Sequence, residues 1–168
     1  VVPLALTVRL GAGSDGSRVL TWSTDIDPDA EQQFTTERTR TGRKVIAKAI
    51  VEDGVRLDDG FALHEDIPEA NSLFVSRAQL QGMTQLGGAS FHDAAVGPPG
   101  VLVRAFDLQV DVQAEASVWS LPAVAAWTAG GTAVYVVARD AEHPLILSAR
   151  RPGTTVRLLA IGTPTPRN

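Results

Sequence analysis

Short stretches in which apolar and polar residues alternate recur along this sequence, and most of them are followed by Gly, Pro or Asp. Successive side chains of a β-strand point to opposite faces, so such alternation gathers the apolar residues on one face of a sheet. Gly, Pro and Asp between the stretches favour tight turns, which join neighbouring antiparallel strands. The pattern therefore predicts an all-β, mainly antiparallel fold of about ten strands.

The clearest strand is predicted from Val101 to Gln113. One of its faces carries the apolar residues Phe106, Leu108, Val110 and Val112, and the other carries Asp107, Gln109, Asp111 and Gln113. We expect the apolar face to pack against a core and the polar face to meet water.

The chain has 168 residues, which is enough for one domain that buries its own hydrophobic core. We expect a single β-rich domain over residues 1–162 and an extended tail over 163–168, where two prolines lack the N–H groups that a sheet requires. A two-sheet sandwich or jelly roll accommodates about ten strands in this length, and a closed β-barrel is the alternative.

Residues 116–138 carry no charge, and a stretch of this length could cross a membrane as a helix. Pro122 near its start and Gly130-Gly131 near its middle instead favour strands joined by a turn. We therefore predict two buried strands, Val118 to Trp127 and Thr132 to Arg139, and no membrane span.

One short helix is predicted over residues 77–86. Ser76 and Gln79 have the spacing of a capping box, in which each side chain bonds the other residue's backbone N–H, and Gly87 ends the segment. The side chains expected to face the core are Leu80, Met83 and Leu86.

Gly11, Gly13 and Gly16 match the glycine spacing of dinucleotide-binding loops. That site requires a helix after the glycines, because the helix N-terminus receives the pyrophosphate. The following residues alternate as a strand does, so we predict a glycine-rich hairpin.

Two further turns are predicted from residue types. Thr41-Gly42 is expected to join a strand at Phe34 to Arg40 with a strand at Lys44 to Val51. Pro152-Gly153 suits a type II turn between Leu145 to Ala149 and Thr155 to Ile161.

The sequence contains no Cys, which excludes thiol catalysis, iron–sulfur clusters, thiolate zinc sites and disulfide bonds. We expect no cofactor. The candidate metal ligands are the hard oxygens of an acidic loop, Asp25, Asp27, Asp29 and Glu31, which could bind calcium. The spacing departs from a calcium-binding EF-hand loop, since Ala30 stands where Gly is needed, so a solvated loop is the preferred interpretation.

All three histidines have an acidic neighbour, and the two pairs that stand out are His64 with Asp66 and His92 with Asp93. A carboxylate can orient a histidine that acts as a general base, so these four residues are the catalytic candidates if the protein is an enzyme. Residues adjacent on a strand point to opposite faces, however, and sequence adjacency alone is weak support for catalysis.

Charged residues of opposite sign form two neighbouring groups. Arg38, Arg40, Arg43 and Lys44 are expected at an exposed hairpin tip, and the stretch 52–69 is acidic and includes Asp58 and Asp59. Such groups could dock one protein subunit on another. Nucleic acid is not expected as a partner, because the net charge is −4 and no aromatic residues interleave with the basic ones.

No catalytic motif stands in its required structural context, so we expect a non-enzymatic structural or interaction protein. It would be a β-sandwich subunit or decorating element of a larger assembly, such as a virion-like or extracellular surface structure, with other protein subunits or copies of itself as partners. A carbohydrate- or small-ligand-binding module that uses Trp22 is the first alternative, with Trp119 and Trp127 expected in the core. A β-barrel hydrolase or isomerase is the second.

Overall fold

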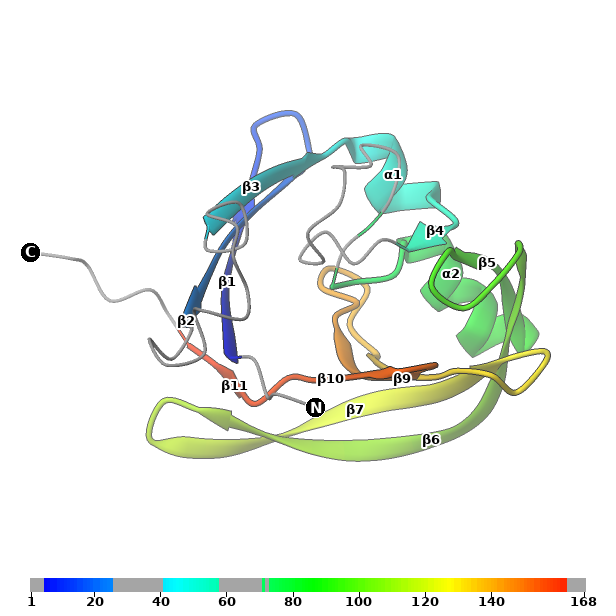
Figure 1. The fold of residues 1–168 in the computed structure, drawn as a ribbon. Helices are drawn as coiled ribbons and strands as arrows, with labels where there is room; N and C mark the ends of the chain where they lie inside the picture. Colours follow the sequence, from blue (N-terminus) through cyan, green and yellow to red (C-terminus); the bar gives the residue numbers. More distant parts are fainter. Residues whose placement is uncertain (1–4, 26–40, 58–70, 72, 163–168) are drawn as a thin grey trace, which may run out of the picture.

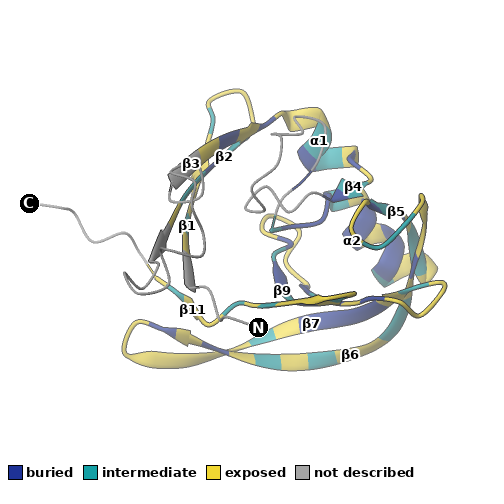
Figure 2. Ribbon diagram, in the orientation of Figure 1, coloured by how far each residue is buried: buried dark blue, intermediate teal, exposed yellow. Residues whose placement is uncertain are grey.

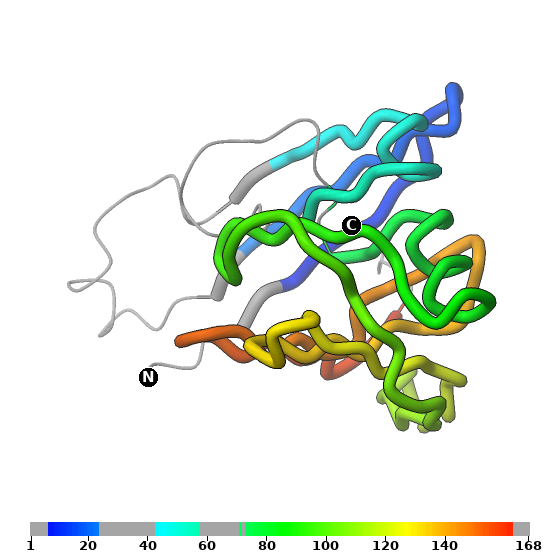
Figure 3. Tube along the Cα trace, turned by 90° about the vertical axis from the view of Figure 1, so that its right-hand side faces the viewer, coloured from blue at the N-terminus to red at the C-terminus, as the bar shows by residue number. Residues whose placement is uncertain are grey.

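A computed structural model describes residues 5–25, 41–57, 71 and 73–162 of this chain. These residues form two β-sheets and two short helical segments. Figure 1 shows the smaller sheet and the larger sheet on opposite sides of the molecule, with the helices along one flank. The view from the side in Figure 3 shows the same separation, with the N-terminal strands above the C-terminal ones.

The smaller sheet is antiparallel and has the order β1 (Ala5–Ala12), β2 (Arg18–Asp25) and β3 (Thr41–Ile46). The glycine-rich segment joins β1 to β2, which confirms the predicted hairpin. Gly16 has a φ of 85°, a conformation that favours glycine. Asp15 accepts a 3.0 Å hydrogen bond from the backbone of Ser17, and bonds from the Ser17 side chain and backbone hold the pKa of Asp15 below its usual value.

The strand predicted from Lys44 to Val51 is wrong in its second half. β3 ends at Ile46, and α1 (Lys48–Asp53) follows it. The helix turns Val51 toward Leu20 and Phe74, with which it forms a small buried cluster, so tertiary packing outweighs the strand preference of the β-branched residues. Thr41-Gly42 is not a turn, because both residues lie in β3 and pair with β2.

The larger sheet has eight strands. In chain order they are β4 (Arg56–Leu57), β5 (Gly88–Asp93), β6 (Gly100–Ala114), β7 (Ser117–Thr128), β8 (Val134–Ala138), β9 (Ile146–Arg151), β10 (Thr154–Arg157) and β11 (Ala160–Ile161). Their spatial order is β10-β9-β8-β7-β6-β5-β4, with β11 beside β6. Only β4 and β11 pair in parallel. The all-β, mainly antiparallel, two-sheet prediction is confirmed, and the path of described strands is open at β10 and β4 rather than closed as a barrel.

The strongest strand predictions are also confirmed. β6 covers the predicted stretch, and β7 and β8 form the predicted hairpin, with Trp127 paired with Val134. Gly153 adopts the positive φ, 74°, that the predicted type II turn requires between β9 and β10. The strand predicted from Thr155 to Ile161 is interrupted, since β10 and β11 pair with different strands. Among the described residues, no helix is long and apolar enough to span a membrane.

The helix predicted over 77–86 is confirmed as α2 (Arg77–Gln81) followed by a π-helical segment, η3 (Gly82–Leu86). Ser76 and Gln79 form the predicted capping box. Met83 is fully buried, but Leu86 is 85% exposed, so its predicted place in the core is wrong. The π-helical turn of Gly82–Leu86 does not keep the 3.6-residue period of an α-helix, so the three-residue spacing of Leu80, Met83 and Leu86 does not place all three on one face.

Apolar residues are buried on both faces of the central strands. On one face, Val124 and Tyr135 pack in the cluster that contains Leu80 and Met83 of the helical segments. On the other face, Ala123, Ala138 and Leu147 pack with Leu158, which follows β10. Residues Ala123 to Ala126 of β7 are therefore all buried, as the dark segment of β7 in Figure 2 shows.

Three aromatic side chains lie outside this core, contrary to prediction. Trp119 is 55% exposed, Trp127 is 43% exposed and Phe106 is 56% exposed. Alternation shows which residues share a face of a strand, but it does not show how much of that face another element covers.

Candidate interaction surface

Most of the candidate site residues predicted from the sequence lie outside the described residues. These are Asp27, Asp29, Glu31, Arg38, Arg40, Asp58, Asp59, His64 and Asp66. Asp25 is described only as the last residue of β2, paired with Ala5. No group of His, Asp and Glu residues in the described part of the chain could hold a metal ion.

The predicted basic group is only partly an exposed surface. Arg43 and Lys44 are neighbours in β3 and point to opposite faces of the small sheet. Arg43 is exposed, whereas Lys44 is 2% exposed. Lys44 therefore does not present its charge to solvent beside Arg43.

His92 and Asp93 are separated in the same way. Asp93 is buried, while His92 is half-buried and donates its backbone N–H to Val55 across the edge of the sheet. Both carboxylate oxygens of Asp93 are engaged: Oδ1 accepts a 2.9 Å bond from the backbone of Ala95, and Oδ2 accepts a 2.7 Å bond from the hydroxyl of Tyr135. This carboxylate is held by the fold rather than directed at His92.

Arg151 completes the buried group around Asp93. Its Nε lies 2.9 Å from Asp93 Oδ2, and its guanidinium lies 5.9 Å from the centre of the Tyr135 ring. The ring of Phe91 meets the Tyr135 ring edge-on, with 5.0 Å between centres. Burial and the hydrogen bond to Asp93 raise the pKa of Tyr135 well above its usual value. The hydrogen bond from Tyr135 to Asp93 and the buried ion pair of Asp93 with Arg151 together link β5 to β8 and β9.

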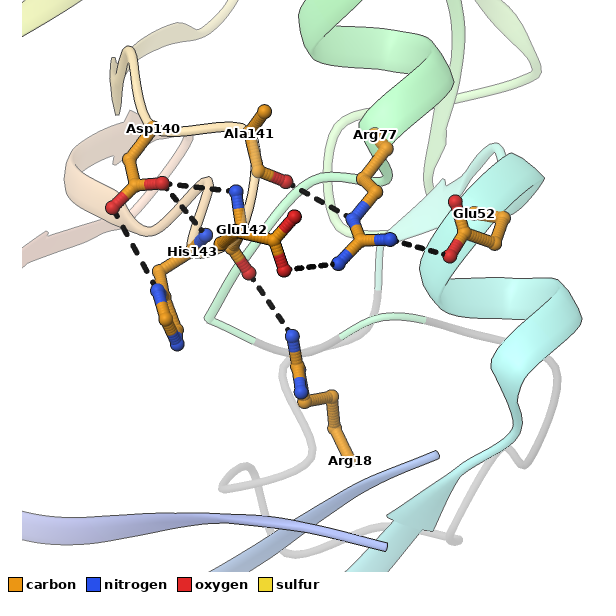
Figure 4. Close-up of polar contacts among 7 residues, drawn as sticks. All are labelled: Arg18, Glu52, Arg77, Asp140, Ala141, Glu142 and His143. Carbon is orange, nitrogen blue, oxygen red and sulfur yellow. Dashed lines mark hydrogen bonds and ion pairs between the residues drawn. The ribbon is translucent and has the colours of Figure 1, made fainter. Parts of the chain in front are cut away.

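A second polar group lies at the surface between α1, α2 and the loop after β8, as Figure 4 shows. Arg77 donates 2.7 Å hydrogen bonds to Glu52 of α1 and to Glu142 of the loop, and a third bond to the carbonyl of Ala141. Arg18 of β2 donates to the carbonyl of Glu142. These contacts join the small sheet and its helix to the large sheet.

The loop in this group also contains Asp140 and His143. Asp140 accepts hydrogen bonds from the backbone of Glu142 and His143, and its carboxylate lies 3.7 Å from the His143 ring. Both side chains are more than half exposed. The Asp140 side chain therefore stabilises a tight turn of the loop, and its contacts with Glu142 and His143 are all within that loop.

The large sheet carries a surface of a different kind. Five exposed apolar side chains, Val101, Val103, Phe106, Trp127 and Val134, form what we call the exposed apolar face. Directly paired residues share a face of a sheet, and the register pairs Val103 with Trp127 and Trp127 with Val134. These three side chains therefore form one row across β6, β7 and β8.

The neighbouring row on the same face lies two residues away along β7 and β8, and three residues away along β6. It contains Phe106, which pairs with Ala125, and Ala125 in turn pairs with Val136. A bulge at Ala105 keeps Phe106 on this face despite the odd spacing from Val103. Val101 lies near the start of β6, two residues before Val103, and extends the face in that direction. The five side chains together expose on the order of 300 Å² of apolar surface.

Sequence reasoning placed these residues on strands but did not identify the surface. The alternation in β6 and the uncharged stretch in β7 and β8 were the available signals, and both were assigned to the core. The strand register alone brings Val103, Trp127 and Val134 into one row, and a bulge that no residue pattern marks keeps Phe106 on the same face.

Comparison with protein families, with curated proteins and with solved structures found no match to this chain.

Proposed function

We propose that this chain is a non-enzymatic interaction protein, a β-rich subunit or decorating element of a larger assembly, and that it binds another protein through the exposed apolar face. The observation that carries the proposal is the row of Val103, Trp127 and Val134 together with Phe106. Contiguous apolar patches of this size on a protein surface are often functional, and aromatic residues are enriched at the centres of interfaces. The virion-like or extracellular setting is part of the proposal and rests on the sequence-based expectation.

The arrangement around Asp93 supports a role without catalysis. A general base must reach a proton on a substrate, and the Asp93 carboxylate is buried with Tyr135 and Arg151. His92, its predicted partner, is on the opposite side of β5. The Asp93 side chain thus has a structural role in the buried group with Tyr135 and Arg151.

A photo-crosslinking amino acid at position 127 tests the proposed function. Position 109 is the control, because Gln109 is exposed on the opposite side of β6. We expect a single saturable protein adduct from position 127, which excess unlabelled wild-type chain suppresses and the Trp127→Thr variant does not. Identical adducts from both positions, or none from position 127, would show that the proposal is wrong.

Trp119→Thr provides the matched control for Trp127→Thr. Both tryptophans are exposed on the same face of β7, and they are separated by roughly 26 Å along the strand. The Trp119 variant should compete for the adduct as the wild type does. Light scattering of the purified chain then shows whether the captured partner is another copy.

A further inference from the structure

We propose that the partner of the exposed apolar face is an amphipathic helix of another protein, with an apolar ridge flanked by two carboxylates. This inference rests on the proposed function and adds the chemistry of the partner. It comes from the charges that the strand register places beside the apolar row.

Two arginines border the apolar residues on one side. Val134 pairs with Arg150 of β9, so Arg150 continues the row of Val103 and Trp127. Ser148 pairs with Arg157 of β10, which places Arg157 at the end of the neighbouring row. Both arginines are exposed, and among the described residues neither has an ion-pair partner.

The same rows contain no acidic residue. From β5 to β10, the first row is Gly88, Val103, Trp127, Val134, Arg150 and Thr155, and the second is Phe106, Ala125, Val136, Ser148 and Arg157. The face is thus apolar at its centre and positively charged at one edge. A partner that covers it must supply the negative charges, because guanidinium groups at an interface are most favourable when a carboxylate pairs with them.

This charge pattern disfavours a second copy of the chain in face-to-face contact. A two-fold interface would bring together two identical surfaces with four guanidinium groups and no carboxylate in the facing rows. Like charges brought together at an interface weaken binding. The occupant is therefore expected to be a different surface.

An anionic membrane is also disfavoured. Surfaces that bind acidic lipids generally present a cluster of about four to eight basic residues, and this face presents only Arg150 and Arg157. The chain has a net charge of −4, so the protein as a whole is repelled by an anionic bilayer. Pairing of Arg150 and Arg157 with two carboxylates of a partner protein requires neither a large basic cluster nor a positive net charge.

The spacing of the two arginines favours a helix as the carrier of the carboxylates. Arg150 and Arg157 are diagonal neighbours on paired strands, at a separation of about 7–8 Å between backbone positions. Carboxylates at positions i and i+4 of a helix are about 6 Å apart and lie beside an apolar stripe of the same helix. Such a helix can cover Trp127 and reach both guanidinium groups.

Two synthetic peptides test this inference by isothermal titration. Each is an amphipathic helix of about four turns with the same leucines, and the flanking positions i and i+4 are Glu in one peptide and Lys in the other. We expect the Glu peptide to bind at least about 10-fold more tightly than the Lys peptide, and added salt to reduce this ratio. Arg150→Glu should lose or invert the preference, whereas Arg9→Glu, an equal charge change at an exposed site on β1, should preserve it.

The outcomes separate this inference from the proposed function. If both peptides bind equally and Trp127→Thr weakens both, protein binding through the face stands and the acidic partner is wrong. If neither peptide binds at millimolar concentration, the inference is also wrong, and the crosslinking result alone decides the proposed function. Binding to phosphatidylserine vesicles without a peptide preference, or a dimer that Trp127→Thr dissociates, would replace the acidic helix with a membrane or a second copy.

Discussion

The hydroxyl of Tyr135 donates a 2.7 Å hydrogen bond to Oδ2 of Asp93, although the two residues are 42 positions apart in the sequence. Arg151 lies against the same carboxylate oxygen, so three strands of the large sheet meet at one buried polar group. Such a group is favourable only while its members remain paired, because an unpaired buried charge is costly.

Removal of either partner should therefore destabilise the protein to different degrees. Tyr135→Phe removes one hydrogen bond and should lower the free energy of unfolding by about 1–2 kcal/mol. Asp93→Asn leaves the buried Arg151 guanidinium without its counter-charge and should cost more, about 3 kcal/mol. Urea denaturation measures both, and equal stabilities of the two variants would contradict this description of the group.

Alkaline titration should show that Tyr135 is protected in the folded state. Its pKa is raised above the usual value of 10.0 by burial and by the bond to Asp93, so its contribution to stability is present below pH 10 and is lost as the pH rises further. Tyr135 is the only tyrosine, so ultraviolet absorbance of tyrosinate reports this residue alone. We expect tyrosinate to appear together with unfolding. Its appearance with the ordinary tyrosine pKa while circular dichroism remains native would contradict the burial.

Substitutions in η3 should distinguish the observed helix from the one expected from the sequence. Met83→Ala creates a cavity at a fully buried position and should lower the free energy of unfolding by about 2–5 kcal/mol. Leu86→Ala changes a side chain that is 85% exposed and should have an effect within about 0.5 kcal/mol. A comparable loss in thermal or urea unfolding of both variants would place Leu86 in the core after all.

Loss of Arg77 should loosen the small sheet from the large one. Arg77→Gln removes the contacts with Glu52 and Glu142, which are partly exposed, so the global loss should be about 1 kcal/mol. Hydrogen exchange should accelerate at Val51 and Gly54 of the α1 segment, whose N–H groups bond within that segment. Arg139→Gln, which breaks an ion pair with Asp107 elsewhere, is the control and should leave these amides unchanged.

The sequence was sufficient to predict the elements whose signals are local. The capping box of Ser76 and Gln79 depends on residues three apart, and the glycine-rich turn before β2 depends on residues that are close in the chain. The alternation in β6 likewise determined the strand and its two faces. These features are set by short-range geometry, which a single sequence contains.

Features that depend on long-range packing were not predicted. Val51 lies in a helix because the helix packs its side chain against Leu20 and Phe74. Trp127 is exposed because neighbouring elements cover only part of its face of the large sheet. The partners of Asp93 come from β8 and β9, and nothing in the sequence near residue 93 indicates them. The candidate surface depends on the register of six strands, which short-range patterns do not determine.

The affinity of the crosslinked partner for purified variants is the most direct test of the claim that the exposed apolar face binds a protein. Isothermal titration should show that Trp127→Thr weakens binding by at least about 30-fold, as expected for an aromatic residue at the centre of an interface. Trp119→Thr should bind as tightly as the wild type, and urea unfolding should confirm that both variants are folded. Equal affinities of the wild type and the Trp127 variant would contradict the account.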